Sequence, residues 1–281
     1  MPVIAMTREL GTLGNEVAQG LARDLGLRLV THETVERLAR KTPLPTNAVL
    51  RCVEGSPTLL ERLRADLGGL SLYAAEEIFE LAAAGDVVIR GWAATHLLRS
   101  VPHVLCVRVC APLEVRARRV MELFSFGDIA LARDEVRRRD AARDAAMRRR
   151  FGADWDQASR YDLVLNTEHV GAQRCIAQIK RALEFAEYQP TTDSRACIHG
   201  LALTARVRSA LWRHAATAEF PILVEADLNG HPGHVKIRGF VANEKQRRHA
   251  EDVVSRIDGV QAVSNDVRAM WPRFVMKSHD G

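Results

Sequence analysis

The opening segment of the chain, VIAMTRELGTLGNEVAQGLARDLG, constrains the fold more than any other feature of the sequence. A short apolar run, a turn that contains glycine and an amphipathic helical pattern follow one another over residues 3–26. This order is typical of a phosphate-binding loop, because the N–H groups at the start of a helix favour an anion. The motif G-x-x-x-x-G-K-[ST] requires a lysine and a hydroxyl, whereas this chain has Gly14, Asn15 and Glu16 after the Gly11 turn. The chain therefore begins like a nucleotide-binding domain that lacks the expected lysine.

Apolar runs alternate with helical patterns through the first two thirds of the chain. The runs at 2–6, 87–89, 104–109 and 163–165 are interpreted as buried parallel strands. This alternation predicts a doubly wound α/β sheet, whose ligand would bind at the carboxyl ends of the strands. Helical spacing is found at residues 15–25, 34–40, 58–67, 71–84, 113–124, 128–150 and 172–187.

A change of pattern after the first two thirds predicts a second, smaller domain. The stretch YQPTTDSR interrupts the helical spacing with proline, threonine and serine, which is typical of a linker. Beyond it we predict an α+β module with helices at 203–213 and 244–257 and strands at 222–228, 234–241 and 262–267. The predicted boundaries are 1–187 for the first domain, 188–200 for the linker, 201–270 for the second domain and 271–281 for a C-terminal tail.

Composition and charge argue against several classes of protein. No run of about 18 apolar residues is present to span a membrane, and Arg8 and Glu9 fall where a secretory signal would be apolar. We therefore expect a cytoplasmic protein. Five cysteines form no C-x-x-C pair, which favours reduced thiols. Eight arginines and four acids between residues 133 and 150 supply most of the net charge of +5, and few aromatics accompany them. This pattern favours a phosphorylated small molecule over a nucleic acid as the partner.

Four segments, in order, resemble the cytidylate-kinase-like family of P-loop nucleoside monophosphate kinases. The opening TRELGTLGNEVAQGLARDLG is similar to that family's S-R-E-x-G-S-G-G-R-E pattern, and GDVVIRGWAA is similar to its G-R-G-A strand end. VLCVRVCAPLEVRARRV resembles the strand and helix that follow, and RRRDAARDAAMRRRFGADWDQASRYDLVLNT resembles the arginine-rich lid, the F-G-x-D-W turn and the closing strand. The resemblance covers residues 3–187. It implies a P-loop kinase fold, the use of ATP and Mg²⁺, and phosphate transfer to a nucleoside monophosphate such as CMP.

This resemblance implies a role for each residue of the opening loop. Backbone N–H groups would hold the donor phosphates, and Gly11 and Gly14 permit a backbone that other residues resist. Arg8 directly follows the first strand and is the cation nearest to the loop, so it would replace the absent lysine. We assign catalysis to Arg8 and phosphate binding to Gly11, Thr12, Leu13, Gly14, Asn15 and Glu16, and we assign no metal-ligating residue.

The predicted helix over 128–150 carries the arginines of the lid. Residues three or four apart share a helix face, so several guanidinium groups can clamp a phosphate together. The alternative interpretation is a solvated helix with ion pairs one turn apart, such as Asp140 with Arg143 and Asp144 with Arg148. We assign catalysis to Arg137, Arg139 and Arg143, and support of the lid to Asp140, Asp144 and Arg148.

Three departures from the family's pattern concern the phosphate and acceptor sites. The Y-D-x-E of the second strand is Val-Thr-His-Glu over residues 30–33, an indole stands at Trp92 where an arginine is expected, and Asn15 replaces an arginine of the loop. We assign acceptor binding to Glu33, Gly91 and Trp92; a packing role for Trp92 and a helix-dipole role for Glu33 are the alternatives. The departures leave two functions open. One is a nucleoside monophosphate kinase, and the other is a degenerate domain that senses a nucleotide or another phosphorylated ligand and signals through the second domain.

The C-terminal module resembles a BON domain through VKIRGFVANEKQRRHAEDVVSRIDGVQAVSNDV. That resemblance implies a protein or lipid-surface partner. Gly239, Gly259 and Asn265 are predicted to serve turns and strand ends. We find no nucleophile–base pair and no metal cluster in this module by sequence.

Overall fold

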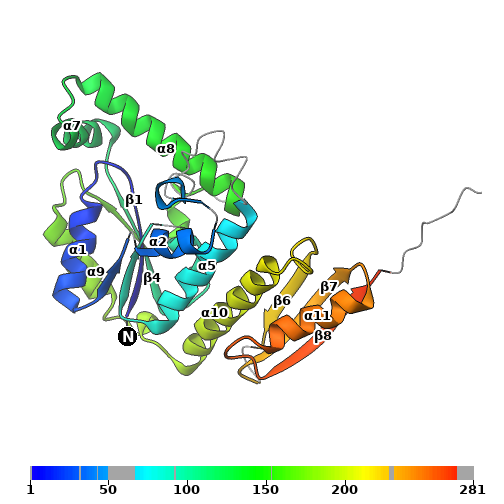
Figure 1. Cartoon of the computed structure of the whole chain (residues 1–281). Helices are drawn as coiled ribbons and strands as arrows, with labels where there is room; N and C mark the ends of the chain where they lie inside the picture. The colour runs from blue at the N-terminus through cyan, green and yellow to red at the C-terminus, as the bar shows by residue number, and fades with distance from the viewer. Residues whose placement is uncertain are drawn as a thin grey trace, which may run out of the picture. The chain divides into compact units, whose positions relative to one another are not determined.

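Five parallel strands form the central sheet of the first of two compact units, which comprise residues 1–195 and 196–281 (Figure 1). The computed structural model describes residues 2–31, 33–42, 44–49, 67–91, 93–152, 154–227 and 231–270. The parallel sheet confirms the doubly wound fold, although the short β2 was indicated only by the family resemblance and not by an apolar run. In the order of the sheet, the strands are β2 (Arg28–Val30), β3 (Val87–Arg90), β1 (Val3–Arg8), β4 (Val104–Cys110) and β5 (Leu163–Asn166).

Helices cover both faces of this sheet, which is why the inner strands β1, β3 and β4 are mostly apolar. Ile4 and Met6 of β1 are fully buried in a core shared with α1 (Gly14–Leu25) and α9 (Ala172–Ala182). A Cβ on Gly20 would lie 2.3 Å from Ile176 Cδ1, so the glycine lets α1 approach α9 closely. The opposite face is covered by α2 (Glu33–Arg40) and α5 (Leu67–Ala84) (Figure 1).

A helical hairpin, α7 (Leu113–Phe124) and α8 (Ile129–Phe151), follows β4. Asp128 caps α8 by accepting a hydrogen bond from Ala130 N at 2.8 Å, and Gly152 ends the helix in a left-handed conformation. Both helices lie within one residue of their predicted limits. The helix predicted over 172–187 ends early, at Ala182. The helix predicted over 58–67 lies outside the described residues except for Leu67. Shorter helices are α6 (Ala94–Leu97), η1 (Ala158–Arg160) and η2 (Ala186–Tyr188).

The second unit contains a sheet of three strands in the order β6 (Ile222–Ala226), β7 (His234–Val241) and β8 (Ala262–Ala269). β6 runs antiparallel to β7, and β8 runs parallel to it. Val224, Val235 and Ile237 share a core with α11 (Glu244–Ser255) and with Leu203 and Val207 of α10.

The helix α10 (Thr192–Arg213) begins eleven residues before its predicted start, inside the predicted linker. Its first turn is a capping box: Ser194 N donates to Thr191 Oγ1 at 3.1 Å, and Thr191 N donates to Ser194 Oγ at 2.9 Å. The residues that suggested a linker therefore start a helix. No helix among the described residues is long and apolar enough to cross a membrane.

Candidate functional site

The loop between β1 and α1 is fixed by two glycines, each for a different reason. Gly11 has φ +80°, and a Cβ there would lie 2.5 Å from Arg116 O, so both conformation and space require glycine. A Cβ on Gly14 would lie 2.6 Å from Arg8 Cβ, because the Arg8 side chain lies against the start of α1. Thr12 Oγ1 donates to Glu9 O at 2.8 Å and closes the turn. Leu13, at the N-cap, offers no side-chain cap, which suits the first N–H groups of α1 to an anion.

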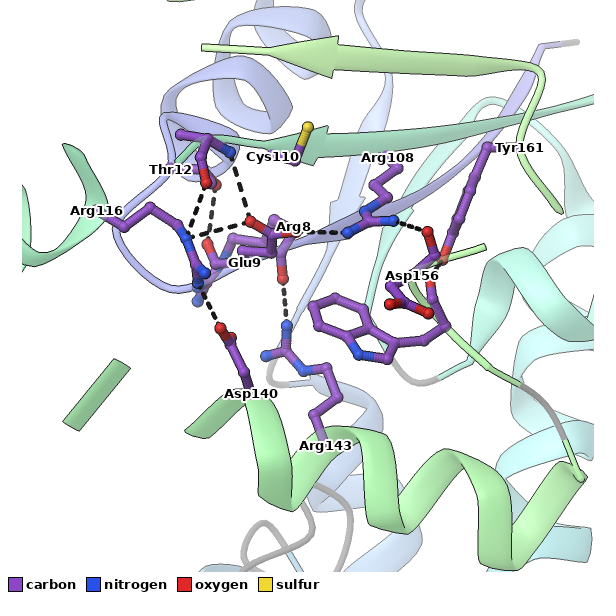
Figure 2. Close-up of polar contacts among 12 residues, drawn as sticks. Arg8, Glu9, Thr12, Arg108, Cys110, Arg116, Asp140, Arg143, Asp156 and Tyr161 are labelled. Carbon is purple, nitrogen blue, oxygen red and sulfur yellow. Dashed lines mark hydrogen bonds and ion pairs between the residues drawn. The ribbon is translucent and has the colours of Figure 1, made fainter. Parts of the chain in front are cut away.

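Glu9 is a buried carboxylate, 5% exposed, at the base of this loop. Its Oε1 accepts from Arg108 Nη2 at 2.7 Å, and its Oε2 lies 3.2 Å from Arg116 Nε (Figure 2). Ala111 N also donates to Oε2, at 3.4 Å. A buried charge persists only when it is paired and hydrogen-bonded, so Glu9 holds a guanidinium from β4 and another from α7 beside the loop.

Arg116 links this carboxylate to the hairpin helix α8. Its Nη1 lies 2.8 Å from Asp140 Oδ2, and its Nε donates to Ala111 O at 3.0 Å. Burial raises the pKa of Asp140, and this effect exceeds the opposing attraction of Arg116. We expected Asp140 to pair with arginines of its own helix, but its ion pair is with α7. The reason is that Asp140 lies on the inner side of α8, toward Arg116 (Figure 2).

Arg143 is the arginine of α8 that turns toward the loop. Its Nη1 donates to the Arg8 carbonyl oxygen, and its guanidinium lies 5.0 Å from the centroid of the Trp155 ring (Figure 2). Arg108 lies 5.3 Å from the same indole and donates to the Asp156 carbonyl oxygen. One largely buried indole therefore orients two guanidinium groups from elements far apart in the sequence.

A further arginine reaches the loop from β3. Arg90 Nη1 donates to Asn15 Oδ1 at 2.6 Å, so the asparagine that replaces an arginine of the family's pattern accepts a hydrogen bond from another arginine. Burial and the nearby Arg143 lower the pKa of Arg90. Two guanidinium groups that repel each other in a partly buried site favour an anion between them. The cations around the loop are Arg8, Arg90, Arg108, Arg116 and Arg143, against the carboxylates of Glu9 and Asp140.

The other predicted lid arginines are exposed, and Asp144 is half-buried. Arg139 is exposed and pairs with Glu135 at 2.8 Å. Arg148 pairs with Asp144 at 2.8 Å and with Asp154 at 3.0 Å, as the alternative interpretation of this helix expected. Arg137 is exposed as well. The structure thus brings Arg143 to the loop, whereas these three arginines are exposed.

The predicted acceptor residues are described only in part. Gly91 directly follows β3 with φ +90°, and its N–H donates to Met6 O at 2.8 Å, which ties the end of β3 to β1. Glu33 is the first residue of α2, but its side chain lies outside the described residues. Trp92 also lies outside them. The assignment of these three residues to an acceptor stays a prediction.

Three residues that shape the site were not anticipated from the sequence: Glu9, Arg116 and Trp155. Arg90 and Arg108 were expected at the carboxyl ends of the strands, but no role was assigned to them. Arg108 had a detectable signal, because a charged residue inside the apolar run VLCVRVC must find a partner when the strand is buried. Trp155 belongs to the quoted turn FGADW, to which no role was given. Arg116 had no such signal, since a basic residue on an amphipathic helix is ordinarily exposed.

Comparisons with known proteins agree with this architecture. Residues 3–169 match the cytidylate kinase-like family, and residues 201–269 match the BON domain. A cytidylate kinase of Pyrobaculum aerophilum is 30% identical over 181 residues, which cover 63% of this chain and 89% of that protein. A cytidylate kinase of Ignicoccus hospitalis is 29% identical over 191 residues, covering 65% of this chain and 99% of that protein. The crystal structure of an uncharacterized protein from Eubacterium ventriosum shares the fold, with a TM-score of 0.52 and 19% identity over 65% of this chain and 98% of that chain.

Proposed function

The chain belongs to the cytidylate kinase-like family, and on that premise we propose that it is a nucleoside monophosphate kinase. It would bind ATP at the loop between β1 and α1 and transfer the terminal phosphate to a monophosphate such as CMP, in the cytoplasm. The observation that carries the proposal is the convergence of Arg8, Arg90 and Arg143 on this loop, from two strands and the hairpin helix.

The geometry suits the requirements of phosphoryl transfer, which depends mainly on positioning and on neutralising charge. The N–H groups at the start of α1 and the Arg8 side chain would hold the donor phosphates. Arg143 would exchange its hydrogen bond to the Arg8 carbonyl oxygen for one to the phosphoryl group that passes from donor to acceptor. Arg108 is held by Glu9 and Trp155, so it would supply fixed positive charge without moving.

Magnesium would neutralise charge on the donor phosphates, and the residue that fits it is Glu16. This carboxylate is exposed in the first turn of α1, where the common motif carries a hydroxyl. Carboxylate oxygens are ligands that Mg²⁺ accepts in its octahedral shell. Glu16 would therefore offer Mg²⁺ a carboxylate oxygen where the common motif offers a hydroxyl oxygen.

A second candidate function is recognition of a nucleotide, or another phosphorylated ligand, without turnover. The contact between Asn15 and Arg90 favours it, because one arginine of the site is held by an amide at a position where the family's pattern has a second arginine. The bound state would then be passed to the BON domain, for which we propose a protein or lipid-surface partner.

One experiment separates the two candidates. Melting of the purified full-length protein is followed with nucleoside mono-, di- and triphosphates, each with and without Mg²⁺, and any ligand that stabilises the fold is then assayed for turnover with CMP, dCMP and other acceptors. The kinase predicts ATP-dependent formation of the diphosphate. Stabilisation without product at high enzyme concentration supports the second candidate. The absence of any melting shift at millimolar nucleotide, together with no product, contradicts both.

A further inference from the structure

The turn between β6 and β7 gathers three side chains that can ligate a metal ion. Asp227, His231 and His234 each offer one ligand atom, and these atoms lie within 4.8 Å of one another. From the sequence we expected no metal cluster in this module, whereas the structure places these three potential ligands together. The spacing D-x₃-H-x₂-H was overlooked because its residues come together only when the two strands pair.

The described residues of this turn, Asp227 and residues 231–233, are held by backbone contacts with the start of β7 and with a neighbouring loop. Asp227 N donates to His234 O at 2.9 Å, and His234 N donates to His231 O at 3.0 Å. Gly233 has φ +83°, and a Cβ there would lie 2.7 Å from Gly259 O. Gln261 N donates to Gly233 O at 2.8 Å, which ties the turn to the segment before β8. The ligand-bearing residues therefore lie on a constrained backbone.

The three side chains lie near the spacing that a metal site requires. His231 Nδ1 lies 3.6 Å from Asp227 Oδ2, and the His231 and His234 rings meet edge-on with centroids 6.2 Å apart. Four tetrahedral ligands on a zinc ion lie about 3.3 Å from one another, given bonds of about 2 Å. Small rotations of the exposed His231 side chain would bring the three ligand atoms to that spacing.

A second polar group fixes one nitrogen of His234. Its Nε2 lies 3.0 Å from Ser264 Oγ on β8, so the hydroxyl can accept the Nε2 hydrogen and leave the lone pair on Nδ1. Histidines that ligate metals usually donate their other N–H to such a partner, which sets the tautomer and the ring orientation. Ser264 gives the cluster this partner.

We propose that Asp227, His231 and His234 bind a divalent transition metal ion, with Zn²⁺ as the best match. Two imidazoles and one carboxylate suit zinc, whereas Mg²⁺ and Ca²⁺ require oxygen ligands throughout. Side-chain exposure of 82% for His231 and 37% for Asp227 leaves the remaining coordination positions open to water or to a group from another molecule. The site is thus an open, exchangeable one.

The same unit contains a competing pair of imidazoles. His249 Nε2 lies 3.0 Å from His214 Nε2, and the ring centroids are 4.2 Å apart. This pair offers two nitrogen ligands, and no carboxylate or thiol joins it as a third among the described residues. Three ligands, one of them anionic, hold zinc more tightly than two, so the turn is the preferred site.

The test uses tag-free full-length protein stripped with EDTA and titrated with Zn²⁺ against a chromophoric chelator. We expect the protein to bind one equivalent of Zn²⁺ tightly. The affinity should fall at least about tenfold in His231→Ala, His234→Ala or Asp227→Asn, and about tenfold in Ser264→Ala. Cobalt(II) substitution should give a visible absorption band that His231→Ala abolishes. The exposed His169→Ala and the double variant His214→Ala/His249→Ala are the matched controls and should bind like the parent.

Three results would overturn the proposal. The first is that the parent protein binds Zn²⁺ no more tightly than the variant that lacks all three ligands. The second is unchanged affinity in both His231→Ala and Asp227→Asn. The third is loss of the tight equivalent only in the His214→Ala/His249→Ala variant, which would place the metal at the other pair. Because His231 is exposed, its variant keeps the fold, and circular dichroism of each variant confirms this.

Discussion

The loop after β1 and the turn between β6 and β7 form two sites by opposite routes. The first draws Glu9, Arg90, Arg108, Arg116 and Arg143 from the loop itself, two strands and two helices, with partners up to 135 residues apart. The second takes three ligands from eight consecutive residues, with only Ser264 contributed from a distance. A site built from distant buried charges is part of what holds the fold together, whereas a site on one exposed turn can change without affecting the fold.

The largest effect should come from Glu9→Gln. This change leaves Arg108 and Arg116 without their buried carboxylate, and breaking a buried ion pair costs about 3–5 kcal/mol. Urea unfolding of the full-length protein measures the loss. Glu135→Gln, which removes an ion pair with the exposed Arg139, is the control and should cost less than about 1 kcal/mol. Equal losses in both variants would show that the network around Glu9 is not special.

Arg143→Ala should act on ligand binding more than on stability. Loss of a charged hydrogen-bond donor costs about 1.5–3 kcal/mol, so nucleotide affinity should fall about ten- to a hundredfold. Isothermal titration with ATP or the best ligand of the melting screen measures it. Arg138→Ala removes an exposed arginine of the same helix that pairs with Glu135, and it should leave affinity unchanged. If Arg143→Ala and Arg138→Ala bind the nucleotide with equal affinity, the contact of Arg143 with the loop does not contribute to nucleotide binding.

Thr191→Ala sharpens the comparison by changing a purely local contact. The variant loses the side-chain oxygen that accepts from Ser194 N, and loss of an N-cap costs about 1 kcal/mol. Thermal unfolding followed by circular dichroism should show this small decrease, with nucleotide affinity unchanged. Thr191→Asn keeps a capping oxygen and should restore most of the stability. No difference between the alanine and asparagine variants would contradict the capping box.

The smallest expected effect is a pH dependence from His96. Burial and the neighbouring Arg160 lower its pKa below the usual value near 6.5, so the unfolded chain binds the proton more readily. The stability that neutral His96 contributes is complete above about pH 6.5 and is lost as the pH falls through that value toward the folded pKa. Between pH 5 and 8, the unfolding midpoint of His96→Gln should change less steeply with pH than that of the parent protein. If the variant and the parent protein show the same pH dependence, a group other than His96 is responsible for it.

Local pattern predicted most of the secondary structure, and its failures have local causes. The opening strand, turn and helix were predicted because glycine at Gly11 and Gly14 and the apolar run before them leave few alternatives. The start of α10 was missed because PTTDS suits either a linker or a capping box, and only the hydrogen bonds between Thr191 and Ser194 distinguish the two. Proline and hydroxyl residues alone therefore do not indicate a segment without helix, and the division between the two compact units, after Arg195, falls within the helix α10.

The sequence by itself determined the doubly wound sheet, the loop after β1 and the presence of an arginine-rich helix. Each follows from periodicity or from residues adjacent in the chain, so no knowledge of distant contacts was needed. Only the tertiary structure decided which cations reach the loop. The parallel register that pairs Arg8 with Val109 sets Arg108 beside Glu9. The rotation and packing of α8 bring Arg143 to the Arg8 carbonyl oxygen, while Arg139, one turn earlier, stays exposed and pairs with Glu135. Neither register nor rotation is fixed by local pattern, because both depend on buried contacts between segments about 100 residues apart.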